Sequence, residues 1–190
     1  MEATLLVELL TEELPPKSLA RMGEAFAKGV SHGLSDSHLL TNDSSMRWFA
    51  TPRRLAVSVS RVLDKAPDRT MTEKIMPVSV AIDANGNPTV ALKKKLASRK
   101  IPESEIQFFV QRLDGKSEMF FYDMSVIGDR LDVALPVLVE TTLKMLPIPK
   151  MMRWGDGEVQ FVRPVHGLVM MHGARVVPGT VLGIQAGRTT

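Results

Sequence analysis

The segment 146–166 constrains the fold more than any other part of this chain, because prolines interrupt it near both ends. Pro147, Pro149 and Pro164 fix the backbone φ angle and remove hydrogen-bond donors, which excludes a long helix there. The segment also carries bases and an indole, a combination typical of a rigid contact with RNA or with a partner chain. These side chains are Lys150, Arg153, Trp154 and Arg163. The alternative is a proline-rich connector whose Trp fills the core.

Hydrophobic periodicity predicts the strands and helices of the remaining chain. Residues 4–10 form an apolar run typical of a central strand, and the alternation at 55–62 indicates a half-buried strand. From Pro16 onward, apolar residues recur at helical spacing, and this helix is expected to end near His32–Gly33. Further strands are expected at 48–49, 71–81, 108–113, 118–127, 167–172 and 175–182, and further helices at 88–100 and 132–146. The last helix is expected to place Leu135, Leu138, Thr142 and Met145 on one face.

This order of elements predicts an α+β fold with a largely antiparallel sheet and about three helices packed on it. The length of 190 residues fits one large domain or two small ones, and the expected division is 1–145 and 146–190. The chain ends directly after an apolar strand, so we expect it to be a fragment of a longer protein.

Cysteine is absent from the sequence, which excludes disulfides, thiolate nucleophiles and cysteine-based zinc sites. No apolar run approaches the roughly 20 residues that span a bilayer. The start Met1–Glu2 carries an acid where a signal peptide carries bases. We therefore expect a cytoplasmic protein with no membrane contact.

Motifs for nucleotide or acyl chemistry are also missing from the sequence. It contains neither a P-loop nor a dinucleotide fingerprint, and no Gly-x-Ser-x-Gly elbow. The four histidines, at positions 32, 38, 166 and 172, lack the spacing of metal ligands. Glu12 and Glu13 are adjacent carboxylates, which either form a catalytic pair or favour a helix N-terminus through its dipole. We expect no catalytic residue and no metal ligand here.

The strongest basic cluster lies in the helix expected at 88–100. It comprises Lys93, Lys94, Lys95, Arg99 and Lys100. On a helix, Lys95 and Arg99 share one face, and Lys93 and Lys100 share another. Such a helix is able to follow RNA phosphates, and a solvated helix face is the alternative.

A second basic point follows Pro52, at Arg53 and Arg54. The planar guanidinium suits a phosphate, so the pair is a candidate RNA contact. Arg54 equally suits an ion pair with a sheet acid such as Glu8. The net charge of +3 permits a local RNA-binding patch without requiring one.

Four segments, taken in order, resemble the β subunit of bacterial heterotetrameric glycyl-tRNA synthetase. The first contains Leu-Leu-Val-Glu at 5–8 and Thr-Glu-Glu-Leu-Pro-Pro at 11–16. The second is Trp-Phe-Ala-Thr-Pro-Arg-Arg-Leu-Ala at 48–56. The third contains Leu-Pro-Ile-Pro-Lys-Met-Met-Arg-Trp-Gly at 146–155 and Phe-Val-Arg-Pro-Val-His at 161–166, and the fourth is Val-Leu-Gly-Ile-Gln at 181–185. The resemblance covers the whole chain and implies the N-terminal region of a longer subunit.

This resemblance implies a ligase that attaches glycine to tRNA(Gly) with ATP and Mg²⁺, in which the α subunit carries the adenylate chemistry. The β subunit contributes tRNA recognition and assembly, so this chain is expected to be non-catalytic and to hold no cofactor itself. Its expected partners are tRNA(Gly) and the α subunit, bound through the basic residues named above. Two alternatives are an editing-like hydrolytic pocket around Glu12, Glu13 and His166, and a scaffold that contacts the α subunit alone.

Overall fold

The computed structural model describes residues 1–148, 151–153 and 159–189, which form two compact units. Unit 1 comprises Met1–Pro67 and Gly128–Thr190, and unit 2 comprises Asp68–Ile127. The chain is thus divided differently from the expected boundary between residues 145 and 146. Unit 2 is an insertion in the sequence of unit 1. No change of composition along the chain marks its boundaries.

Unit 1 is built on a five-stranded sheet in which every neighbouring pair of strands is antiparallel. The strands are β1 (Glu2–Thr11), β2 (Met46–Thr51), β3 (Arg54–Leu63), β9 (Val165–His172) and β10 (Arg175–Val176). Their order is β10-β9-β1-β3-β2, which confirms the expected central position of the first strand. Leu5, Val7 and Leu9 of β1 are buried in the core, as their apolar side chains require.

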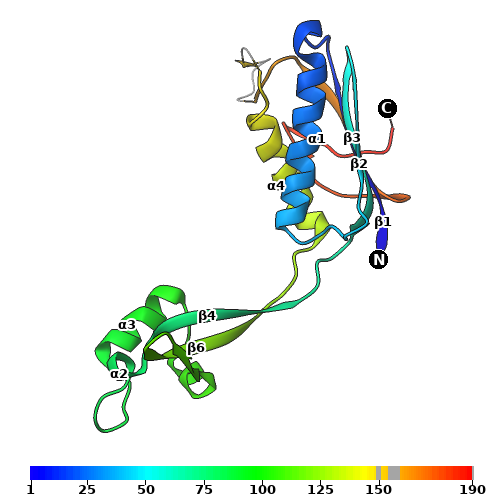
Figure 1. Ribbon diagram of the computed structural model, residues 1–190. Coiled ribbons are helices and arrows are strands. Elements are labelled where there is room, and N and C mark those ends of the chain that lie inside the picture. Colours follow the sequence, from blue (N-terminus) through cyan, green and yellow to red (C-terminus); the bar gives the residue numbers. More distant parts are fainter. Residues whose placement is uncertain (149–150, 154–158, 190) are drawn as a thin grey trace. The chain divides into compact units, whose positions relative to one another are not determined.

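Helices α1 (Leu19–Asp36) and α4 (Leu131–Lys144) cover one face of this sheet (Figure 1). A short 3₁₀ turn at Pro16–Ser18 precedes α1, and α1 continues through Gly33 beyond its expected end. Glycine is needed there for close packing rather than for a turn, because a Cβ on Gly33 would lie 2.5 Å from Leu138 Cγ of α4. The buried face of α4 also differs from expectation, since Met145 is 70% exposed and Val139 is buried instead.

The C-terminal part of unit 1 also contains four short strands. They are β7 (Met152–Arg153), β8 (Gln160–Phe161), β11 (Thr180–Val181) and β12 (Ile184–Gln185), paired as β7–β8 and β11–β12. The strand expected at 175–182 is interrupted after β10, because Pro178 has no N–H to continue a ladder. Among the described residues of segment 146–166 there is no helix beyond Leu146, as its prolines predict.

Unit 2 has a three-stranded antiparallel sheet in the order β4-β6-β5. Its elements are β4 (Arg69–Pro77), α2 (Val78–Ala81), α3 (Val90–Arg99), a 3₁₀ turn at Glu103–Phe108, β5 (Val110–Asp114) and β6 (Ser117–Val126). The strand expected at 71–81 ends at Pro77, which precedes the first turn of α2. The expected hairpin is confirmed, with Gly115 at φ +64° in its turn.

The α+β class is therefore confirmed, and the strand pairs of both units are antiparallel. The three long helices are α1 and α4 in unit 1 and α3 in unit 2. Within the described part of the chain, no helix is long and apolar enough to cross a membrane.

Candidate functional site

Three segments with motif residues meet at one end of the unit 1 sheet, at residues 11–16, 51–54 and 163–166. We call this region the sheet corner. Backbone hydrogen bonds join the segments to one another, so their backbones are held side by side. The bonds run from the Thr11 N–H to Arg53 O (2.9 Å), from the Glu12 N–H to Pro164 O (3.0 Å) and from the Leu14 N–H to Pro52 O (2.6 Å).

Arg54 stands at the start of β3 and forms an ion pair with Glu8 of β1. Arg54 Nη1 lies 2.9 Å from Glu8 Oε1, and Glu8 is only 7% exposed. A carboxylate so deeply buried needs a charged partner, since desolvation would otherwise disfavour its ionised form. The structural alternative for Arg54 is therefore confirmed, and this guanidinium is engaged within the fold.

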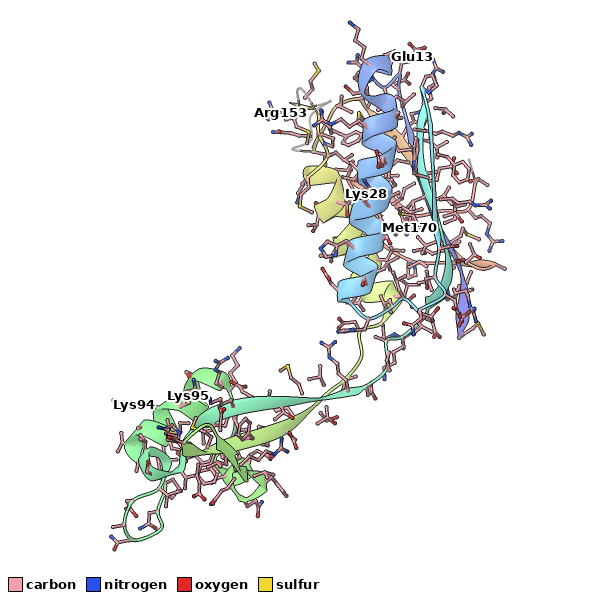
Figure 2. The ribbon with its side chains drawn as sticks, in the orientation of Figure 1. Glu13, Lys28, Lys94, Lys95, Arg153 and Met170 are labelled. Atoms are coloured by element: carbon pink, nitrogen blue, oxygen red, sulfur yellow. The ribbon has the colours of Figure 1, made fainter. Side chains whose placement is uncertain are left out.

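The other two arginines of the sheet corner both contact Glu13. Arg53 Nη2 lies 3.7 Å from Glu13 Oε1, and both side chains are largely exposed. Arg163 Nε donates a hydrogen bond of 2.7 Å to the backbone oxygen of Glu13. Figure 2 shows Glu13 at the end of unit 1 where α1 begins. Each cation of the sheet corner thus has an acceptor within the corner or the adjoining strand.

A hollow of about 490 Å³ lies beside the sheet corner, between the end of α4, the β7–β8 pair and the β11–β12 pair. Its apolar lining includes Leu143, Val159 and Leu182. Among the described residues that line it, the charged side chains are Glu140 and Lys144, which pair with each other at 3.1 Å. Arg163 lines a smaller adjacent hollow of about 120 Å³.

Helix α3 of unit 2 carries the basic cluster. Leu92 and Leu96 are buried and hold the helix on the sheet, which leaves the charged side chains at the surface. Two members of the cluster pair with acids, because Lys93 Nζ lies 3.1 Å from Glu103 Oε2 and Arg99 Nε lies 3.1 Å from Glu73 Oε1. Thr89 caps the N-terminus of α3, where its side chain accepts a hydrogen bond from the Leu92 N–H.

Lys94, Lys95 and Lys100 are different, since they have no ion-pair partner among the residues that the structure describes. Lys94 and Lys100 are exposed, and Lys95 is partly exposed. Figure 2 shows Lys94 and Lys95 on α3. These three ammonium groups, which we call the unpaired lysines, keep their charge available for an external anion.

The remaining candidates lie in the segment 146–166. Arg153 is an exposed residue at the end of β7, as Figure 2 shows. Lys150 and Trp154 lie outside the described residues. Whether Trp154 is a contact or a core side chain therefore stays a prediction.

The histidines and acids do not form a metal site in the described ranges, where no three His, Asp or Glu side chains group together. His172 is buried, and its Nε2 lies 2.7 Å from Val62 O. The imidazole therefore forms a hydrogen bond with the backbone of the sheet. His166 is exposed, and the backbone of its segment joins that of Glu12 through Pro164.

Sequence reasoning missed the acids that decide which cations are available. Glu73 and Glu103 come from a strand and a turn on either side of α3 in the sequence. Their ion pairs with Lys93 and Arg99 were not predictable from spacing along one helix. Glu8 was the exception, because a single acid inside an apolar strand signals that it needs a partner.

The geometry defines an α+β module with a braced sheet corner and a separate basic helix. The family described as glycyl-tRNA synthetase beta subunit matches residues 5–190. The chain is 56% identical over 188 residues to the glycine–tRNA ligase beta subunit of Aromatoleum aromaticum, which covers 99% of this chain and 27% of the relative. It is 46% identical over 190 residues to the same subunit of a Janthinobacterium species, with 98% and 27% covered.

The chain therefore belongs to the glycyl-tRNA synthetase beta subunit family, and the resemblance found in its motifs is confirmed. It spans about 27% of the length of these relatives.

Proposed function

We propose that this chain is the non-catalytic N-terminal module of a glycine–tRNA ligase β subunit. In this proposal it supports tRNA(Gly) binding and assembly with the α subunit, and the complete enzyme forms glycyl-tRNA in the cytoplasm. The family match supports the assignment to this enzyme, since the matching relatives are named as beta subunits of this ligase.

The observation that carries the RNA contact is the set of unpaired lysines on α3. Lysines without an acidic partner attract phosphates over a longer range than paired ones, because no neighbouring carboxylate cancels their charge. Binding to phosphates releases counterions and is therefore salt-dependent and independent of base sequence. We assign α3 to the sugar-phosphate backbone of tRNA(Gly) rather than to its bases.

We assign ATP and Mg²⁺ to the α subunit. The present chain has no glycine-rich loop to hold phosphates. Its described residues also contain no group of three carboxylates or histidines that suits a metal ion. The described residues of this chain therefore do not fit the nucleotide or its ion.

The proposal is tested with ATP–pyrophosphate exchange and tRNA binding, each measured on the complete α and β subunits and on α alone. Exchange is also measured on this chain alone. We expect glycine-dependent exchange from the α subunit, and tighter tRNA(Gly) binding when the β subunit is added. Exchange by this chain alone, clearly above a blank without protein, would contradict the non-catalytic assignment. Unchanged tRNA affinity on adding the β subunit would favour the scaffold alternative.

The editing-like alternative has one supporting observation, which is the backbone bond that joins Glu12 to the segment of His166. Against it, Glu13 already contacts Arg53. Deacylation of mischarged tRNA by the complete enzyme decides between the two, since the non-catalytic module adds no hydrolysis. A Glu12→Gln variant serves as the control for a specific effect.

A further inference from the structure

We infer that the unpaired lysines give unit 2 an RNA contact, and that unit 2 is a separable insertion whose removal leaves unit 1 folded and able to assemble. The inference rests on the proposed function, because it locates the tRNA contact proposed there. It places this RNA contact on unit 2 and leaves unit 1 able to fold without it.

The two segments of unit 1 that flank unit 2 are hydrogen-bonded to each other at the insertion point. The N–H of Ala66 donates to Asp129 O (2.9 Å), and the N–H of Leu131 donates to Asp64 O (2.9 Å). A Cβ on Gly128 would lie 1.9 Å from Ala66 O and 2.9 Å from Pro67 O, so the two segments touch at the insertion point. Because these bonds join residues of unit 1, they do not depend on the inserted chain.

Unit 2 contains a hydrophobic core of its own. Ile75, Leu92, Leu96 and Phe120 are buried in one cluster, which includes no residue of unit 1. The larger cluster of unit 1 likewise includes no residue of unit 2. Each unit therefore buries its own apolar surface, which is the main source of its stability.

The unpaired lysines lie closer together in the sequence than the exposed cations of unit 1. In the sheet corner, Arg53, Arg54 and Arg163 each have an acceptor. Unit 1 also has exposed cations, such as Lys17 and Arg21 around the start of α1, and Arg47 on β2. The unpaired lysines instead lie within seven consecutive positions, 94–100, on one helix and its C-cap. This short segment therefore offers three ammonium groups to the phosphates of an RNA.

The test replaces residues 68–127 by Asn-Gly, which joins Pro67 to Gly128 through a two-residue turn suited to antiparallel segments. The variant is made in the complete β subunit and purified with the α subunit. We expect folding and α-subunit association to persist. We expect tRNA(Gly) affinity to fall about tenfold or more, as for the loss of three phosphate contacts at moderate salt.

A second variant, K94E/K95E/K100E, keeps unit 2 in place and is expected to lose as much tRNA affinity as the excision. Wild-type affinity in a folded, excised complex would place the RNA contact on unit 1 and overturn the inference. Failure of the excised subunit to fold, or to bind the α subunit, would overturn separability. If the wild-type β subunit adds nothing to tRNA binding by the α subunit, the proposed function fails instead.

Discussion

The sheet corner of unit 1 and helix α3 of unit 2 are both rich in cations, but they differ in what surrounds those cations. At the sheet corner, a buried carboxylate, an exposed carboxylate and a backbone oxygen receive the three guanidinium groups. On α3, Lys93 and Arg99 are paired with acids, and the unpaired lysines have no such partner among the described residues. The three arginines of the sheet corner thus contact groups of their own unit, whereas the unpaired lysines of α3 have no ion-pair partner among the described residues.

The difference teaches that local basic composition does not by itself indicate an RNA contact. Arg54 compensates a desolvated carboxylate, and such a pair resists separation because it would leave a charge buried alone. An exposed lysine, by contrast, loses little free energy when a phosphate replaces the water around its ammonium group. The following predictions test this distinction, from the largest expected effect to the smallest.

Replacing Arg54 with Ala should destabilise unit 1 by about 2 kcal/mol. Breaking a buried pair costs about 3–5 kcal/mol, and a lower value is expected here because the Arg54 side chain is 44% exposed. Chemical denaturation measures the change, and Arg54→Lys should recover part of it by restoring the charge. A denaturation midpoint equal to that of the wild type would show that Glu8 does not depend on this pair.

Replacing Tyr122 with Phe should destabilise unit 2 by about 1 kcal/mol, since it removes a hydrogen bond. Tyr122 Oη donates to Glu105 Oε2 at 2.7 Å, and this bond, together with burial and the carboxylate charge, raises the pKa of Tyr122. Because the folded pKa is the higher one, the stabilisation is complete below the unfolded value of about 10 and is lost as pH rises through the folded pKa.

Tyr122 is the single tyrosine of the chain, so tyrosinate absorbance reports its titration directly. The native protein should titrate at higher pH than the unfolded one, and Glu105→Gln should reduce the difference. Identical titrations of the native and unfolded chains would refute the assigned hydrogen bond.

Replacing Arg53 with Ala should change stability by no more than about 0.5 kcal/mol, because exposed ion pairs contribute little. Its partner Glu13 is exposed too, at a distance of 3.7 Å. The neighbouring Arg54→Ala variant is the matched comparison, and the two denaturation midpoints should differ clearly. Equal losses in both variants would remove the distinction between a buried and an exposed partner.

The fold class and most elements were predictable because they depend on local periodicity. The central strand at 4–10, the helix that contains Met22 and Phe26, and the hairpin around Gly115 all follow from spacing and turn residues. Features that depend on distant contacts were not predictable. Gly33 continues α1 because it packs on Leu138, and unit 2 is an insertion because residues 64–67 and 128–131 pair across it.

The candidate site likewise has features that were predictable from the sequence and features that were not. The basic residues were visible in the sequence, and so was the need of Glu8 for a partner. Which lysines on α3 remain unpaired depends on Glu73 and Glu103, which reach the helix only through the fold. Charge near a motif was therefore a poor guide to the residues available for RNA.

The most direct test compares the salt dependence of tRNA(Gly) binding for two variants of the complete β subunit with its α subunit. One carries K94A/K95A/K100A, and the other carries R53A/R163A. Each lost phosphate contact lowers the magnitude of the log–log slope by roughly 0.7–0.9. We predict a decrease of about 2 to 3 for the lysine variant and an unchanged slope for the arginine variant. An unchanged slope for the lysine variant with a reduced slope for the arginine variant would contradict the account.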